Sequence, residues 1–424
     1  PGAPGAPADP GGGGGEGATP AGPNQASDVG VTETTLRIGT IVAENGVLGD
    51  TFAPAATGLR AWVEPVNAQG GIGGRTLELF TCDDREDRAR VLECARQLVE
   101  QDQVFALIAT NTRALGGAAQ YLHDQGIPVL GNPINNSFYR FDNFFSVYGS
   151  PYPRNNQVAG FDGQLASYTT VPRFLREELG ASRAAVFSYD VAESAQAGDF
   201  MQGGLEREGF TVDRYVVSFA APSFDAPVAE MQRNGTTVIL DAMDEGANRR
   251  LCDAMERRGF TVNAKVSTIV VMGDSLGENF GPACRPVTYI LGDSIPYTDT
   301  SVPFIASYRE AMGQYQRGQE LHQWGLEAWV MGQMLQDYLV AAGPAPTRQG
   351  FMAALNALDG ASPAGIMTPT IRYSGPPASA ATVPDCIGAS RWDDAAGGWV
   401  PAAPFPYCIP DAQQFFTPVA EQGT

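Results

Sequence analysis

The segment Gly273–Gly277 carries residue types that could support hydrolysis. It reads GDSLG and matches G-x-S-x-G, the turn that exposes a nucleophilic serine, and it follows the apolar run 266–272, which we expect to be a strand. A serine nucleophile needs a histidine base. His322 is the only histidine after Ser275, and no His-Gly-Gly-Gly segment supplies oxyanion donors. We therefore expect a protein that is not an enzyme and has no catalytic residue, and we keep a serine esterase acting through GDSLG as an alternative.

The cysteines are the second set of residues that could take part in chemistry. None of them forms a C-x-x-C motif, and with only two histidines in the chain, His123 and His322, no zinc-like cluster is present. We expect neither a metal nor a cofactor. An even number of well-separated cysteines favours disulfides formed in an oxidising compartment. Sequential pairing is the simplest of the possible connectivities, which would join Cys82 to Cys94, Cys252 to Cys284, and Cys386 to Cys408.

The charge of the chain excludes some partners. Lys and Arg number 27 against 47 Asp and Glu, which gives a formal net charge of −20. The electric field of this negative charge repels nucleic acid and anionic lipid, so we expect no polynucleotide partner. No stretch approaches the roughly 18 consecutive apolar residues of a membrane helix.

Residues 1–30 are dense in Gly and Pro and contain almost no large apolar side chain. Such a segment cannot offset the entropy of ordering, so we expect a disordered tether. A tether before a folded domain suits a lipoprotein that stands off a membrane. We expect an exported protein whose signal has been removed or is left out of this sequence, located outside the cytoplasm, either lipid-anchored to the outer face of the cell membrane or periplasmic.

The pattern of apolar residues predicts how these groups are positioned. From Leu36, short β-branched runs alternate with amphipathic helical stretches, and the alternation restarts at Ala184, which predicts two units with parallel sheets. The expected strands are 36–42, 76–81, 104–109, 127–130 and 144–148, then 184–189, 211–219, 237–241 and 265–272. Two long helices are expected at 304–316 and 323–341, and the Gly, Pro and Trp-rich tail 390–406 shows no periodicity.

Two segments join a strand to a proline-marked turn and are candidates for crossings between the units: Val147–Pro153 and Leu291–Tyr297. We therefore expect one lobe to comprise residues 35–149 plus 295–368. The other lobe would comprise residues 150–294 plus 369–424, with its tail tied by a disulfide.

The glycine-rich segment VNAQGGIGGRTLEL is the most informative stretch. Phosphate-binding loops lie between a strand and a following helix, whereas Gly70–Gly74 end a helix and lead into a strand. The glycines therefore predict a helix C-cap and tight turn rather than a nucleotide site.

Together with the strand and helix before it and FTCDDREDRARVLECARQLVEQDQVFALIAT after it, this segment resembles the leucine/isoleucine/valine-binding protein family, the type I periplasmic solute-binding proteins of ABC importers. The resemblance runs from Leu36 through Asn135 and more loosely to Tyr373. It implies an α/β fold of two doubly wound lobes with parallel sheets, joined by a multi-strand hinge. It also implies a monomer that captures a small molecule, amino-acid-like or a carboxylate, and delivers it to an ABC transporter permease. A ligand-sensing receptor domain of the same fold is the alternative.

The resemblance places ligand contacts in loops at the carboxyl ends of strands, where open α/β sheets bind ligands. The implied residues are Glu44, Asn45, Asn111, Thr112, Arg113, Pro133, Asn135, Tyr148, Tyr189, Asp190, Asp241, Asp274 and Tyr297. Arg113 and Asn135 stand where the family usually has hydroxyl side chains, which argues against an unmodified branched-chain amino acid.

Each proposed role has a structural alternative. Asp241 or Asp274 would neutralise an ammonium group, and Arg113 would hold a carboxylate through a bidentate bond. Alternatively, Arg113 is a surface residue paired with a neighbouring acid, and Asp241 is a helix N-cap. The tyrosines near the crossings would line the cleft or pack the hinge.

Overall fold

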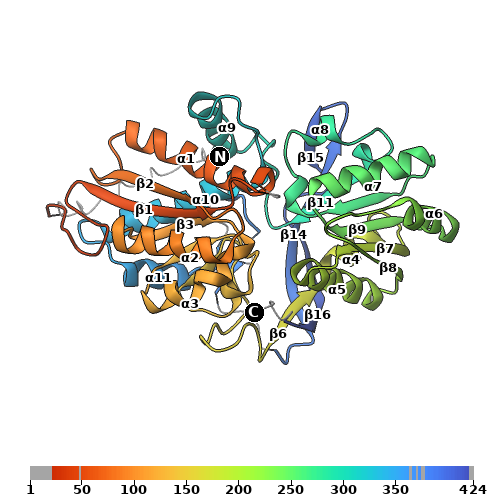
Figure 1. The fold of residues 1–424 in the computed structure, drawn as a ribbon, viewed down its shortest axis with the longest axis horizontal. Coiled ribbons are helices and arrows are strands. Elements are labelled where there is room, and N and C mark those ends of the chain that lie inside the picture. Colours follow the sequence, from red (N-terminus) through yellow and green to blue (C-terminus); the bar gives the residue numbers. More distant parts are fainter. Residues whose placement is uncertain (1–21, 47–48, 362–364, 369–370, 374–377, 420–424) are drawn as a thin grey trace, which may run out of the picture.

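The computed structural model describes residues 22–46, 49–361, 365–368, 371–373 and 378–419. The described chain forms two α/β lobes side by side, with the long strands β14 and β16 of the second lobe near the boundary between them (Figure 1). Most of the expected leader, residues 1–21, lies outside the described residues.

The first lobe is built on a five-stranded parallel sheet in the order β2-β1-β3-β4-β5. Its strands are β1 Thr35–Val42, β2 Thr76–Asp83, β3 Ala106–Thr110, β4 Val129–Gly131 and β5 Phe144–Ser146. Its helices are α1 Gly49–Ala68, α2 Arg88–Arg96, α3 Gly116–Asp124, α9 Pro303–Tyr315, α10 Gln323–Ala342 and α11 Arg348–Asn356.

Helices cover both faces of this sheet, which explains why its strands are apolar on both sides. Ile38 of β1 packs in a cluster with Leu59 and Trp62 of α1. Ile41 of the same strand packs in a separate cluster with Val91 and Leu98 on the opposite face. An odd spacing along a strand places side chains on opposite faces, so one short run supplies both halves of the core.

The second lobe is built on a nine-stranded sheet in the order β6-β16-β14-β11-β10-β9-β7-β8, with β15 added beside β14. Its strands are β6 Gln164–Tyr168, β7 Arg183–Tyr189, β8 Thr211–Val217, β9 Val238–Ala242, β10 Ala264–Ser267, β11 Thr288–Gly292, β14 Thr382–Asp393, β15 Gly398–Pro401 and β16 Tyr407–Pro418. Its helices are α4 Thr170–Glu177, α5 Ala192–Arg207, α6 Asp225–Asn234, α7 Glu245–Arg257 and α8 Leu276–Asn279.

Two local predictions for the second lobe are wrong. The segment 390–406, expected to be an irregular tail, contains the end of β14 and all of β15, which pair antiparallel. The end of β14 reads SRWD and β15 reads GWVP, so polar residues, Gly and Pro interrupt the apolar run that marks a central strand. The strand expected over 265–272 ends at Ser267 and continues as the 3-10 turn Ile269–Val271.

The glycine-rich turn after α1 has the predicted form. Gly70 and Gly71 adopt φ of 96° and 76°. A Cβ on Gly71 would lie 1.9 Å from the carbonyl oxygen of Arg75. Only glycine fits this turn between a helix and a strand, so the segment is structural.

All three sequential disulfides are present, and they join Cys82 to Cys94, Cys252 to Cys284, and Cys386 to Cys408. The first ties β2 to α2, and the second ties α7 to the segment before β11. The third links directly opposed residues of β14 and β16.

The last residues of the expected leader are part of the folded first lobe. The Asn24 side chain donates to the carbonyls of Glu33 and Gly73, and the Gln25 backbone donates to Pro344. The Ser27 hydroxyl donates to Pro346. This part of the tether prediction is therefore wrong for residues 24–27.

The chain passes between the lobes from β5 to β6, from β11 to α9, and from β13 (Ile371–Arg372), which pairs with β12 (Asp359–Ala361), to β14. The crossings bond to one another. The Ser150 amide donates to the carbonyl of Arg372, and the Thr368 amide donates to the carbonyl of Asp293. The multi-strand hinge of the predicted fold is therefore present.

Candidate ligand-binding cleft

A cavity of about 430 Å³ lies between the lobes, and we call it the cleft. It lies at the carboxyl ends of strands of both sheets, where an open α/β fold leaves a crevice. From the first lobe and the crossing after it, the lining residues are Thr51, Phe52, Arg113, Pro133, Ile134, Asn136, Tyr139, Tyr152 and Trp324. From the second lobe they are Leu165, Ala166, Tyr189, Val191, Ala192, Glu193, Ser194, Gln196, Ala197, Phe200, Phe219, Ala242, Met243, Asp244, Thr268, Ile269 and Val270.

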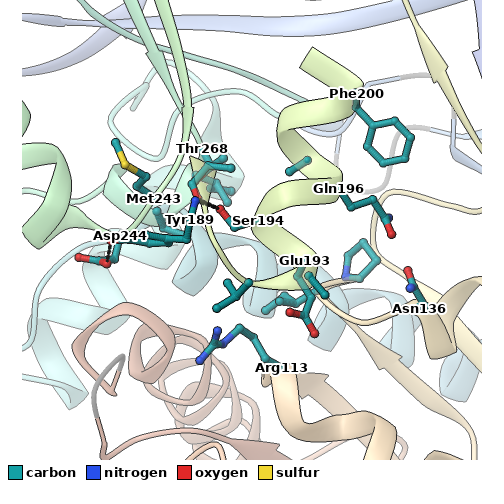
Figure 2. A pocket seen from close by; sticks show the side chains of 18 of the residues that line it. Arg113, Asn136, Tyr189, Glu193, Ser194, Gln196, Phe200, Met243, Asp244 and Thr268 are labelled. Carbon is teal, nitrogen blue, oxygen red and sulfur yellow. Dashed lines mark hydrogen bonds between the residues drawn. The ribbon is translucent and has the colours of Figure 1, made fainter. Parts of the chain in front are cut away.

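Aromatic side chains form much of the wall of the cleft. Phe52 stacks on Trp324 with ring centroids 5.3 Å apart in the first lobe. In the second lobe, Tyr189 meets Phe219 edge to face at 5.0 Å. The polar side chains enter from opposite sides, with Arg113 on one side and Glu193 of α5 on the other (Figure 2). Such a cavity suits a small molecule with a substantial apolar part.

Arg113 lies in the cleft but is paired within its own lobe. Its Nε donates to Glu86 at 3.1 Å, and its Nη2 bonds to the same carboxylate oxygen. Its guanidinium also lies 5.6 Å from the centroid of the Phe219 ring of the second lobe. The alternative prediction, an arginine paired with a neighbouring acid, therefore describes the geometry.

Tyr189 also lines the cleft, together with an acid that sequence reasoning missed. The Tyr189 hydroxyl donates to Asp244, whose other oxygen caps α7 by accepting from the Ala247 amide at 3.1 Å. Burial, with the bond to Asp244 next, raises the pKa of Tyr189. Ser194, also missed, donates to the carbonyl of Ala242 at 2.6 Å. A capping acid before a helix was the available signal for Asp244.

Most of the other residues predicted in the first lobe bond to neighbouring protein groups around the cleft. Of them, only Pro133 lines it. Glu44 forms an ion pair with Arg60, and Asn45 donates to Asp83 at 2.8 Å. The Thr112 hydroxyl donates to Asp84 at 2.6 Å.

The side-chain amides of two predicted asparagines differ in their hydrogen bonds. The Asn135 side chain accepts from the Ser137 amide at 2.8 Å and thereby opens a 3-10 turn. Asn111 is fully buried at the end of β3, and neither of its amide atoms has a partner among the described residues.

Asp241 does neutralise an ammonium group, but that group belongs to the protein. It is fully buried, and its carboxylate accepts from the Lys265 ammonium at 2.8 Å and from the Ser267 hydroxyl at 2.6 Å. Lys265 is the only lysine of the chain. The N-cap of α7 is Asp244, so neither role predicted for Asp241 is correct.

Asp190, Asp274 and Tyr297 are absent from the lining of the cleft. The Tyr297 hydroxyl donates to Asp274 at 2.6 Å, and burial raises the pKa of that carboxyl. Asp190 accepts from the Phe219 amide at 2.8 Å.

The GDSLG segment lacks the histidine base that an esterase requires. The Ser275 hydroxyl bonds to Glu245 at 3.2 Å. His322 Nδ1 accepts from the Trp324 amide at 3.1 Å, and Nε2 lies 3.3 Å from the carbonyl of Val270. Since both ring nitrogens face other groups, the geometry gives the esterase alternative no support.

Two further cavities, of about 320 Å³ and 480 Å³, adjoin the cleft at the crossings, and we call them the hinge cavities. Tyr148, another predicted residue, lines both and donates to Glu327 of α10 at 2.6 Å. The Glu327 carboxyl also accepts from Asn132 and Ser294. Burial raises the pKa of Glu327 to about 8.

In the described part of the chain, no group of three or more His, Cys, Asp and Glu side chains is arranged to hold a metal ion. Among the described helices, none is long and apolar enough to cross a membrane.

Comparison with known proteins shows the family of this chain. The model of the periplasmic binding protein family matches residues 35–383. A leucine-binding protein LivK from Thermotoga maritima has 16% identity and a TM-score of 0.65, with 88% of this chain and 98% of that chain covered. A fatty acid ABC transporter substrate-binding protein from Thermomonospora curvata has 16% identity and a TM-score of 0.68, with coverage of 91% and 94%.

A solute-binding protein of an ABC transporter from R. palustris, solved in complex with benzoate, also has 16% identity. It has a TM-score of 0.64, and the alignment covers 89% of this chain and 98% of that one. The family and the fold implied by the sequence are both confirmed.

Proposed function

Because this chain belongs to the periplasmic binding protein family, we propose that it is the extracytoplasmic solute-binding protein of an ABC importer. It captures a small molecule between its lobes and presents it to the transporter permease. Proteins of this family and fold are substrate-binding proteins rather than enzymes, which agrees with the arrangement around Ser275.

The observation that carries this proposal is that both lobes line one cleft. Arg113 of the first lobe and Phe219 of the second face each other across it. A solute held there contacts both lobes, and it favours the closed arrangement because it gains contacts in that arrangement that are absent when the lobes part. Three crossings allow closure by hinge motion.

The lining favours a ligand with an apolar body over a zwitterionic amino acid. The charged groups expected to bind both ends of an amino acid are already paired, Arg113 with Glu86 and Asp241 with Lys265. Aromatic and aliphatic side chains, together with Glu193 and several uncharged polar residues, remain to contact the solute. Relatives of this fold named for leucine, fatty acids or benzoate support a solute that is small and partly apolar.

Three disulfides support a location in an oxidising compartment. We propose a monomer that works outside the cytoplasm. The tether and lipid anchor remain predictions, because residues 1–21 lie outside the described structure.

A thermal-shift screen of small acids, amides, amines and aromatic compounds tests the proposal. A true ligand at about 100 times its Kd adds about 2.7 kcal/mol to stability and raises the Tm. Loss of uptake of that ligand on gene deletion identifies an importer, whereas retained uptake with a lost cellular response identifies the sensor alternative. Binding of no compound by the protein, or binding unaffected by substitutions in the cleft, would contradict the proposal.

A further inference from the structure

Asp293 lies in the crossing after β11 and lines both hinge cavities. Its backbone is fixed, because its carbonyl accepts from the Thr368 amide at 2.7 Å. Its carboxyl group has no hydrogen-bond or ion-pair partner among the described residues. The carboxyl groups of Glu86, Asp241, Asp244, Asp274 and Glu327 are each bonded within the protein, whereas that of Asp293 is not.

The cavities that contain Asp293 adjoin the cleft. The cleft and the first hinge cavity share Phe200, Thr268 and Ile269 in their walls. The cleft and the second hinge cavity share Tyr139 and Tyr152, together with Pro133 and Ala166. A molecule whose apolar body lies in the cleft therefore has Asp293 at the hinge end of its site.

Among the described residues, the surroundings of Asp293 supply negative charge and hydroxyl groups but no available cation. The titratable side chains near it are Tyr139, Tyr148, Tyr168, Glu327 and Asp385. Arg372 also lines the second hinge cavity, but it is exposed and has an interaction of its own. Arg113, in the cleft, is paired with Glu86.

An enclosed carboxylate without a partner is costly, and a protein usually avoids that cost by protonation or by supplying a cation. Burial and the nearby Asp385 raise the pKa of Asp293 to about 7. Asp293 therefore presents to the hinge cavities a carboxyl group that becomes ionised when a positive charge lies beside it.

We propose that Asp293 binds the ammonium group of an amphipathic amine whose apolar body fills the cleft. This inference rests on the proposed function and names the chemical class of its solute. An amine without a carboxylate fits better than an amino acid, because the arginines that line these cavities already have partners. The charge of −20 on the chain also favours a cationic solute.

Matched probes with one apolar body test the assignment by isothermal titration calorimetry. One set is phenethylamine, phenethyl alcohol, phenylacetate and phenylalanine, and the other is octylamine, octanol and octanoate. We expect the amine to bind at least about tenfold more tightly than the other members of its set, since a charge-assisted hydrogen bond in an enclosed site is worth that much.

Asp293→Asn should lower the affinity for the amine at least about tenfold and leave the affinity for the alcohol within about twofold. Asp293→Glu should retain part of the preference. Asp385→Asn is the matched control, because it removes the same charge from the same cavity and keeps an oxygen for the Thr170 hydroxyl. If Asp385→Asn lowers the amine affinity less than Asp293→Asn does, direct contact with Asp293, rather than the overall negative charge of the cavity, accounts for the binding.

Wild-type protein provides a test that needs no variant. Amine binding should weaken about tenfold between pH 8 and pH 6, as Asp293 becomes protonated while the amine stays charged. The inference is overturned if no amine outranks its alcohol and acid, or if Asp293→Asn binds the amine like the wild type. Tight binding of alcohols or acids in those cases would leave the proposed solute capture intact, whereas failure of every solute to bind would remove both.

Discussion

The Tyr148 hydroxyl donates a 2.6 Å hydrogen bond to the Glu327 carboxyl and so connects the first crossing to α10. The Ser294 hydroxyl of the second crossing donates to the other oxygen of the same carboxyl. Glu327 is fully buried, so one side chain holds two hinge segments against the first lobe.

Tyr148→Phe removes a donor from this buried carboxyl and should destabilise the protein by about 1–3 kcal/mol. Urea denaturation followed by fluorescence measures the change. Tyr407→Phe is the control, since its hydroxyl lies near the surface, 3.5 Å from Glu178. Equal effects of both substitutions would argue against a special role for the Glu327 network.

The same carboxyl should make stability depend on pH. Burial raises the pKa of Glu327 from 4.5 to about 8, so the folded protein binds a proton there that the unfolded chain releases above pH of about 4.5. This contribution to stability is fully present below pH of about 4.5 and is lost as pH rises towards 8. We expect the free energy of unfolding to fall between pH 5 and pH 8, and Glu327→Gln to flatten that slope. A surface variant such as Asp337→Asn should leave the slope unchanged.

The buried pair of Lys265 and Asp241 should be sensitive to the loss of one partner. Lys265→Met leaves Asp241 as an unpaired buried charge, for which we expect a loss of about 3–5 kcal/mol. Adding Asp241→Asn should recover part of that loss. The exposed pair of Arg257 and Asp225 is the comparison, and Arg257→Ala should change stability little. Additive effects in the Lys265 and Asp241 double variant would show that the two residues are not coupled.

Ala197 of α5 lines the cleft, and a larger side chain there would occupy the space of the solute. Ala197→Trp should reduce ligand affinity at least about tenfold in a calorimetric titration. Circular dichroism should show that the variant is folded. Val216→Trp, at an exposed position of β8, is the matched control and should bind normally. Normal binding by Ala197→Trp would place the solute outside the cleft.

The Cys386 to Cys408 disulfide ties the two long paired strands β14 and β16 and spans a sequence separation of 22 residues. Replacing both cysteines with serine should lower stability by about 2–4 kcal/mol, because the crosslink restricts the unfolded chain. Differential scanning calorimetry measures the shift in Tm. An unchanged Tm would mean that the strand pairing alone holds the tail.

The sequence alone determined the two-lobed α/β architecture and predicted the disulfide pairing that the structure shows. Apolar periodicity and glycine turns are local, so the alternation of strands and helices from Leu36 and the turn at Gly71 could be read directly. The end of β14 and all of β15 were missed because polar residues, Gly and Pro interrupt their apolar pattern.

The tertiary structure decided which polar residues are available to a solute. Sequence reasoning nominated Arg113 and Asp241 because polar groups follow strands, but it could not show that Glu86 and Lys265 pair with them. It missed Asp293, which stands in a predicted crossing. Whether a charged side chain is paired or faces a cavity depends on contacts between segments far apart in the chain. Local sequence patterns do not predict those contacts.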